Sequence, residues 1–176
     1  MNIQVFIFKL VAITSYILRF ALLVLPISLI VVISKEGGWQ YGFTFIQNNI
    51  GVALFVAFAV GFLVALYHAL SYELVGEGPL SNYLRTKQNV NVKGGNSIEK
   101  LERDLNQLRG YKDIKREGDR LTAKKNAMFL KPDQITIEKL GEEYSVESKP
   151  FTSWWFIDFG RNFKTVKKIA KAIKSV

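Results

Sequence analysis

His68 is the only histidine in the 176-residue sequence, and there is no cysteine. Zinc sites built from cysteine and histidine, disulfides and thiol nucleophiles are therefore excluded. His68 lies within a long apolar segment, and Arg19 lies within another. Ionisable side chains at membrane depth are candidates for an ion or proton pathway. The alternative is a structural role, because both residues lie near one end of their segments, where a long side chain can reach the headgroups.

No catalytic motif connects the remaining polar residues. A phosphate-binding glycine loop ends in Lys followed by Ser or Thr, whereas Gly76 and Gly78 precede Pro79. The motifs HExxH and GxSxG are also missing from the sequence. Asp158 is a candidate site residue, but its place just before a predicted helix is typical of an Asp that stabilises a helix N-terminus. We expect no enzyme activity, no metal site and no cofactor.

Five lysines recur along the last predicted helix, residues 162–174. Helical spacing places them on the face opposite the apolar residues of that helix. They are Lys164, Lys167, Lys168, Lys171 and Lys174. Such a face is attracted to an anionic membrane surface or to an acidic protein partner, and a merely solvated face is the alternative. We do not expect a nucleic-acid partner, because the helix lacks interleaved aromatic residues and a recognised motif.

Two long apolar segments precede this basic region. Residues 37–72 contain no Asp, Glu, Lys or Arg, and as a helix residues 50–72 would reach roughly 34 Å, enough to cross a bilayer core of about 30 Å. Residues 10–34 form the other segment, interrupted by Arg19. A secretory signal peptide is the alternative there, although the first eight residues lack a positive charge and no small-residue cleavage site follows. We predict that residues 1–72 form a transmembrane helical hairpin in an α+β membrane protein.

The distribution of basic residues predicts the orientation of this hairpin. The connection between the two segments, residues 35–49, contains a single basic residue, Lys35. Lys9 lies at the other end of the first segment, and Arg85, Lys87 and Lys93 follow the second. Because cytoplasmic loops are enriched in Lys and Arg, both termini should be cytoplasmic.

Small residues recur at intervals of four along the second segment: Ala53, Ala57, Gly61, Ala65 and Ala69. They line one face of a helix, where small side chains let another backbone approach closely. The sequence therefore predicts a helix-packing face. Its partner is either the first helix of the same hairpin or a second protomer or other membrane protein, beside the membrane lipids.

The composition changes after Tyr72. Residues 73–96 mix Gly, Pro, Asn and charged residues and are predicted to be a linker. Residues 97–109 are predicted to form an amphipathic helix, capped by Asn96 or Ser97 and ended by Gly110. Turn signals then recur among short apolar runs, at Gly118, Pro132, Gly141 and Pro150. They predict about five antiparallel strands, with residues 153–159 a central strand or a membrane-facing edge, so that residues 97–176 form a cytoplasmic α+β domain.

This layout resembles small bacterial membrane proteins in which a transmembrane hairpin carries a cytoplasmic pleckstrin-homology-like β domain that ends in a helix. The resemblance covers most of the chain and is strongest in the tail SKPFTSWWFIDFGRNFKTVKKIAKAI. It implies a multi-pass protein of the bacterial inner membrane with a PH-like domain. It carries over no site residues.

Two functional hypotheses follow from these features and from the formal net charge of +9. The first is a non-enzymatic inner-membrane adaptor or accessory subunit, whose basic cytoplasmic domain contacts the anionic leaflet or a protein partner. The alternative is a small oligomeric subunit of a transporter or channel, with Arg19 and His68 as part of a pathway. Two helices alone are too few for a pore, so the alternative requires a homo-oligomer or another membrane protein.

Overall fold

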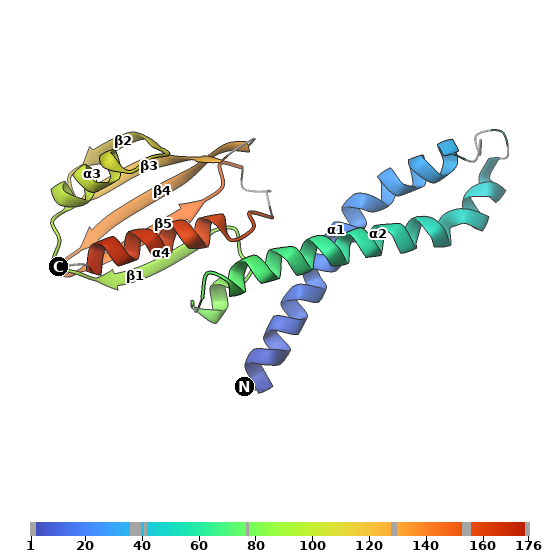
Figure 1. Cartoon of the computed structure of the whole chain (residues 1–176), viewed down its shortest axis with the longest axis horizontal. Coiled ribbons are helices and arrows are strands. Elements are labelled where there is room, and N and C mark those ends of the chain that lie inside the picture. Colours follow the sequence, from blue (N-terminus) through green and yellow to red (C-terminus); the bar gives the residue numbers. More distant parts are fainter. Residues whose placement is uncertain are drawn as a thin grey trace. The chain divides into compact units, whose positions relative to one another are not determined.

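The computed structural model of the chain describes residues 3–35, 40, 42–76, 78–127, 130–152 and 156–174. The chain divides into two compact units, Met1–Ser71 and Tyr72–Val176 (Figure 1). The apolar segments predicted from the sequence lie in the first unit, and all the strands lie in the second.

Two long helices make up the first unit, α1 (Ile3–Lys35) and α2 (Gly42–Glu73), the last two residues of α2 belonging to the second unit. Each is long and apolar enough to cross a membrane, with a mean hydropathy of 2.6 in its most apolar stretch. By length and composition, these helices support the interpretation as a membrane protein.

The described part of the second unit contains one five-stranded antiparallel sheet, two α-helices and a short 3-10 helix. The elements follow in the order η2 (Leu80–Asn82), β1 (Gln88–Lys93), α3 (Ile98–Gln107), β2 (Tyr111–Glu117), β3 (Arg120–Ala127), β4 (Leu130–Leu140), β5 (Glu143–Lys149) and α4 (Arg161–Lys174). The strand order across the sheet is β1-β5-β4-β3-β2. The predicted α+β class is therefore confirmed, and so are the two helices that flank the meander of β2 to β5.

Strand β1 falls within residues 73–96, the stretch for which the sequence predicted a linker. It pairs antiparallel with β5, with Val90 opposite Val146. Val92 faces the core, whereas Asn89 and Asn91 are exposed. A strand with only two apolar residues beside several Asn, Gln and Lys has the composition of a linker, and pairing with β5 supplies the tertiary contacts that make it a strand.

The predicted strand at residues 153–159 is wrong for the part that the structure describes. Phe156, Ile157 and Asp158 form a loop that leads into α4, and residues 153–155 lie outside the described residues. Of the described apolar residues in this run, Ile157 is buried and Phe159 is exposed.

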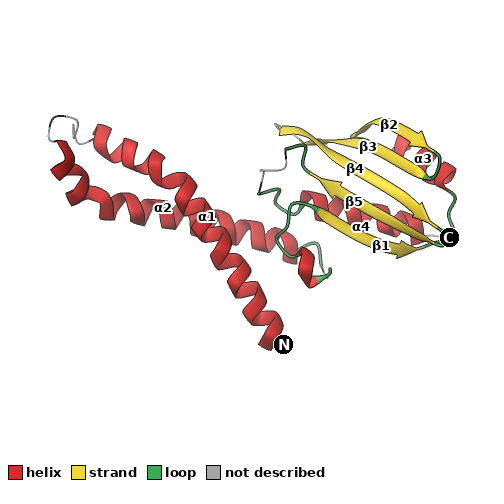
Figure 2. Ribbon diagram, turned by 180° about the vertical axis from the view of Figure 1, so that it is seen from behind, coloured by secondary structure: helices red, strands yellow, loops and turns green. Residues whose placement is uncertain are grey.

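Both helices cover the same face of the sheet, α3 over β2 and β3 and α4 over β1 and β5 (Figures 1 and 2). The core lies between them, where Leu101 of α3 and Ile169 and Ile173 of α4 meet the buried face that includes Ile137 and Tyr144. As expected, Ser97 caps α3, because its hydroxyl accepts a hydrogen bond from Lys100 N at 3.3 Å. The core thus fixes which face of α4 stays outside.

Candidate functional site

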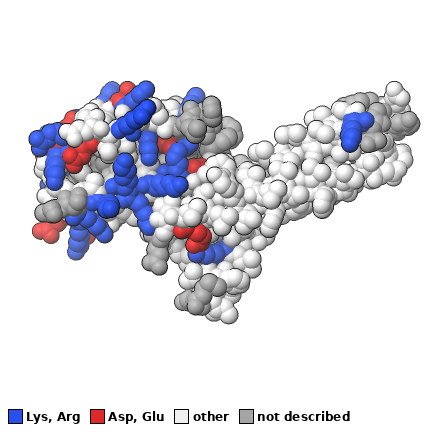
Figure 3. Space-filling view, in the orientation of Figure 1, with Lys and Arg blue, Asp and Glu red and all other residues white. Residues whose placement is uncertain are grey.

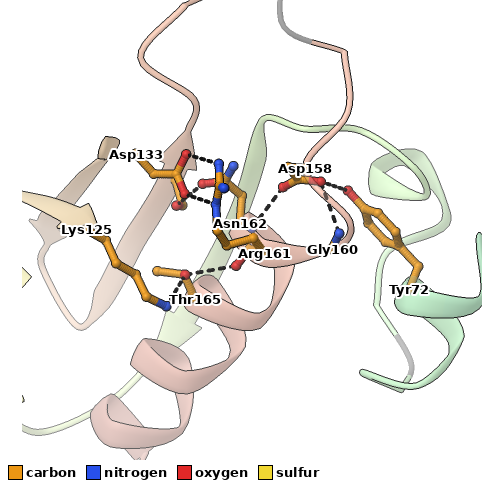
Figure 4. Close-up of polar contacts among 9 residues, drawn as sticks. Tyr72, Lys125, Asp133, Asp158, Gly160, Arg161, Asn162 and Thr165 are labelled. Atoms are coloured by element: carbon orange, nitrogen blue, oxygen red, sulfur yellow. Dashed lines mark hydrogen bonds and ion pairs between the residues drawn. The ribbon is translucent and has the colours of Figure 1, made fainter. Parts of the chain in front are cut away.

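The start of α4 is stabilised by a buried carboxylate, that of Asp158, which is 3% exposed. Its Oδ1 accepts from Gly160 N at 3.1 Å, and its Oδ2 accepts from Asn162 N at 2.9 Å (Figure 4). Phe159 and Gly160 have positive φ angles of 50° and 70°, a left-handed turn that lets the carboxylate face the first amides of the helix. The predicted role of Asp158 at a helix N-terminus is confirmed.

Tyr72, near the end of α2, joins the same cluster from within the second unit. Its hydroxyl lies 3.2 Å from Asp158 Oδ1, donates to the carbonyl of Arg85 and accepts from Gln88 Nε2 at 3.3 Å. Its ring stacks on Phe163 of α4 with a centroid separation of 5.4 Å. Tyr72 is 2% exposed, so this residue links the loop before β1 to the first turn of α4.

Burial is the main cause of the pKa shifts of Asp158 and Tyr83 in this cluster. It raises the pKa of Asp158 above the ordinary value of 3.8, and the hydrogen bonds from Asn162, Gly160 and Tyr72 only partly offset it. Burial, reinforced by the Glu73 carboxylate, raises the pKa of Tyr83 to about 12. Tyr83 packs edge-on against Tyr72, so the two phenol rings form one wall of the cluster.

A second group of polar contacts fixes the opposite side of the same helical turn (Figure 4). Arg161 makes two bonds to the fully buried carboxylate of Asp133 in β4, of 2.5 Å from Nε and 2.7 Å from a terminal nitrogen. Lys125 Nζ donates to Thr165 Oγ1 at 2.7 Å, and Thr165 donates to the carbonyl of Arg161. Burial, followed by the charge of Lys168, lowers the pKa of Lys125. The first turn of α4 is thus attached to β3 and β4 as well as to Tyr72.

The lysines of α4 are not equivalent. Lys164, Lys168, Lys171 and Lys174 are exposed. Lys167 is half-buried: its Nζ donates to Val75 O at 3.2 Å and lies 5.3 Å from the centre of the Phe163 ring. Basic side chains gather on the visible face of the second unit (Figure 3).

Several acidic residues of the second unit form ion pairs with basic residues outside α4. Glu147 lies 3.0 Å from Lys87 and 3.2 Å from Lys149, and Lys124 lies 2.8 Å from Asp113. Burial alone would raise the pKa of Glu147, but hydrogen bonds from the two lysines lower it. Within the described part of the chain, no acidic residue forms an ion pair with the four exposed lysines of α4. Asp104 lines a hollow together with Lys168 and Lys171, and Glu142 lines one together with Lys174.

A groove of about 680 Å³ runs between α4 and β1. Its apolar lining comes from both elements: Val90, Val92, Phe163, Val166 and Ala170. The lysines that line it are Lys167, Lys168, Lys171 and Lys174, and none of the described lining residues is acidic. The groove therefore combines an apolar floor with a cationic side.

In the first unit, the five small residues of the predicted packing face are all buried. A Cβ added to Gly61 would lie 2.9 Å from Ile17 O and 3.1 Å from Ala21 N, both on α1. Further along the row, Ser28 Oγ donates to Ala53 O at 3.0 Å. The face thus meets α1 within the same chain, which is the first of the two partners considered from the sequence.

Arg19 and His68 both contact the ring of Tyr16. The His68 ring lies 5.2 Å from the Tyr16 ring between centroids, and the Arg19 guanidinium carbon lies 5.5 Å from the centre of the same ring. His68 is fully buried and Arg19 is exposed. These contacts have the form of side-chain packing, and a role for the two residues in a pathway stays a prediction.

The residues that sequence reasoning missed are Tyr72, Gln88, Asp133 and Lys125. Tyr72 was interpreted as the end of an apolar segment, and Gln88 as part of a linker. The available signal was the place of Lys125 and Asp133 in their strands. Each lies two residues from an apolar residue, Ala123 or Ile135, and therefore on the same face of the strand, which places a charge on the core face. A charge there is stabilised only if another charged or polar group meets it.

The part of the chain that the structure describes contains no group of three or more metal-ligating residues. The chain matches no family model, no curated protein and no solved structure. The layout of two apolar helices followed by a five-stranded antiparallel sheet is compatible with the resemblance drawn from the sequence.

Proposed function

We propose that the protein is a non-enzymatic adaptor or accessory subunit of the bacterial inner membrane, whose basic domain contacts the anionic leaflet through α4. In this proposal α1 and α2 span the membrane as a hairpin and both termini are cytoplasmic. The layout is compatible with that of bacterial membrane proteins that carry PH-like domains, which supports this setting, as does the scarcity of basic residues between the two helices.

The observation that carries the proposal is the exposed positive charge of α4. Lys164, Lys168, Lys171 and Lys174 are exposed, and no acidic residue in the described part of the chain forms an ion pair with them. Contacts of Asp158, Arg161 and Tyr72 fix the first turn of the helix, so its charges occupy defined positions. Each Lys close to an anionic membrane surface gains about 1 kcal/mol, an attraction that falls off within a Debye length.

The test compares the full-length protein in nanodiscs of phosphatidylcholine alone and of phosphatidylcholine mixed with phosphatidylglycerol. Lysine acetylation by a succinimidyl ester is followed residue by residue with mass spectrometry. We expect the four exposed lysines of α4 to react about threefold more slowly in the anionic discs, and high salt to remove the difference. Lys112 and Lys115, exposed on β2, serve as internal controls that should react equally in both discs.

A variant separates leaflet contact from general effects of the lipid. With Lys168, Lys171 and Lys174 changed to Gln, the remaining Lys164 should lose its protection in anionic discs. Equal acetylation of the α4 lysines in both lipids, or protection of Lys112 and Lys115 to the same extent, would contradict the proposal.

A further inference from the structure

Strand β1 leaves one edge of the sheet open. It is the terminal strand of the order β1-β5-β4-β3-β2, so among the described strands it pairs on one side alone, with β5. Gly94 N donates toward β5, to Glu142 O, while Asn89 O accepts from Asn82 Nδ2 on the other side. Because main-chain groups alternate in direction along an antiparallel strand, Asn91 and Lys93 present their N–H and C=O groups on the open edge.

The groove between α4 and β1 lies beside this edge. Asn91, whose main-chain groups face outward, is one of its lining residues, and Val90 and Ala170 contribute to its apolar floor. Lys171 and Lys174 are exposed along the α4 side. A ligand in the groove would therefore meet three kinds of group together: unpaired main-chain donors and acceptors, an apolar floor and a row of positive charges.

We propose that this groove binds an acidic, extended segment of a partner protein, which adds to the sheet as a strand next to β1. The main chain of the segment would pair with Asn91 and Lys93. Every second side chain of the segment would lie on the α4 side of the sheet. On that side, apolar side chains would contact the floor near Val90 and Ala170, and carboxylates at other positions of the same side would pair with Lys171 and Lys174. This inference rests on the proposed function in one respect, because the bound segment would belong to the partner protein that an adaptor requires.

Charge and hydrogen bonding favour this occupant over two others. An acyl chain over the edge would remove water from the N–H and C=O groups of Asn91 without replacing its hydrogen bonds, which is costly. A second copy of the chain paired through β1 would bring two sets of α4 lysines toward each other, and like charges across an interface oppose association. An acidic strand satisfies the main-chain groups and the lysines together.

The experiment uses the full-length protein in phosphatidylcholine nanodiscs and a fluorescein-labelled eight-residue peptide, in which Val and Glu share the side that faces α4 and Thr occupies the positions between them. Fluorescence anisotropy should show saturable binding that weakens with salt, and hydrogen exchange at the amides of Asn91 and Lys93 should slow when the peptide is bound. A peptide with Lys in place of each Glu should not bind. Lys171→Gln with Lys174→Gln should weaken binding of the acidic peptide.

Two substitutions at Asn91 test strand addition directly. Asn91→Pro removes an outward N–H and leaves the pairing with β5, so binding should weaken about tenfold, whereas Asn91→Thr keeps the N–H and should bind like the wild type. The proline variant keeps every lysine, so its leaflet contact in anionic discs should be unchanged. This separates failure of the groove proposal from failure of the proposed function.

N-methylation of alternate peptide amides removes the same hydrogen bonds from the ligand side, which keeps the test valid if Asn91→Pro unfolds. The inference is overturned if no saturable binding occurs up to about millimolar peptide, the weak limit of specific association. It is also overturned if the N-methylated peptide binds like the unmodified one, or if the amides of Asn91 and Lys93 are not protected. Displacement of the peptide by dihexanoyl phosphatidylglycerol, with no protection of these amides by either ligand, would assign the groove to lipid instead.

Discussion

Asp158→Ala should destabilise the second unit, because it removes the group that accepts hydrogen bonds from the first amides of α4. Loss of an N-cap costs about 0.5–2 kcal/mol, and a buried donor left without an acceptor costs about 1–3 kcal/mol. Gly160 and Asn162 are both buried, so water replaces the carboxylate poorly. Tyr72 keeps the carbonyl of Arg85 as a partner, so its hydroxyl adds little to the loss. Since the two costs overlap, we expect a loss of about 2–3 kcal/mol in the free energy of unfolding.

The loss should depend on pH, with a sign set by the raised pKa of Asp158. Between 3.8 and that raised pKa, the folded protein binds more protons at this carboxyl than the unfolded chain does. The contribution of Asp158 to stability is therefore fully present below pH 3.8 and decreases as pH rises through the raised pKa. The alanine variant lacks this dependence, so the wild type should exceed it most at acidic pH and least near neutrality.

The assay is urea unfolding of the full-length protein in detergent, followed by hydrogen exchange of α4 peptides and repeated from about pH 3 to about pH 8, a range that includes the ordinary pKa of Asp. Glu138→Ala, at an exposed position of β4, is the control and should change stability by no more than about 0.5 kcal/mol. If Asp158→Ala has no larger effect than Glu138→Ala, the cap contributes nothing to stability. A difference between wild type and variant that grows toward neutral pH would show that burial does not govern the carboxyl.

Gly61→Leu should disrupt packing between α1 and α2, since an added Cβ already meets the α1 backbone at 2.9 Å. Val60→Leu, at an exposed position of the same helix, should be tolerated, and disulfide crosslinking between cysteines introduced on the two helices should distinguish the variants. Unchanged crosslinking in Gly61→Leu would show that the small residues do not set the helix contact. Reporter fusions at residues 1 and 176 should both indicate the cytoplasm and a fusion near Thr44 the outside; opposite results at the two ends would exclude the hairpin.

Elements with strong local signals could be predicted from the sequence. Residues 37–72 and 20–34 are the two longest stretches without a charged residue. Helices α3 and α4 have apolar residues at helical spacing, with a cap or turn before each. Strand β1 could not be predicted in this way. Its two valines are too few to mark a strand, and its pairing depends on β5, more than fifty residues later in the chain. Non-local pairing of this kind leaves little trace in local composition.

In the candidate site, too, some features could be predicted from local sequence and others depend on residues far away in the chain. The lysines of α4 follow from helical spacing alone, so the basic face was predictable, but the half-buried position of Lys167 depends on Val75, ninety-two residues earlier in the chain. The groove was not predictable for a related reason, because part of its lining comes from β1. The sequence pattern thus predicts which side chains share a helix face. Which other parts of the chain lie against that face depends on tertiary contacts.

The polar cluster at the start of α4 links the lysine pattern of the helix to its tertiary contacts. In a helix with several lysines and no acidic residue, the positive charges repel one another. The partial positive charge that the helix dipole places at the N-terminus adds to that repulsion. Asp158 opposes it at the N-terminus, and the buried Asp133 anchors Arg161 in the first turn. Both carboxylates are buried, and neither reduces the charge presented by the exposed lysines. A protein that only needed a stable helix could place acids among the lysines on its surface. Stabilisation from the buried side instead leaves the outer face free to attract an anionic ligand.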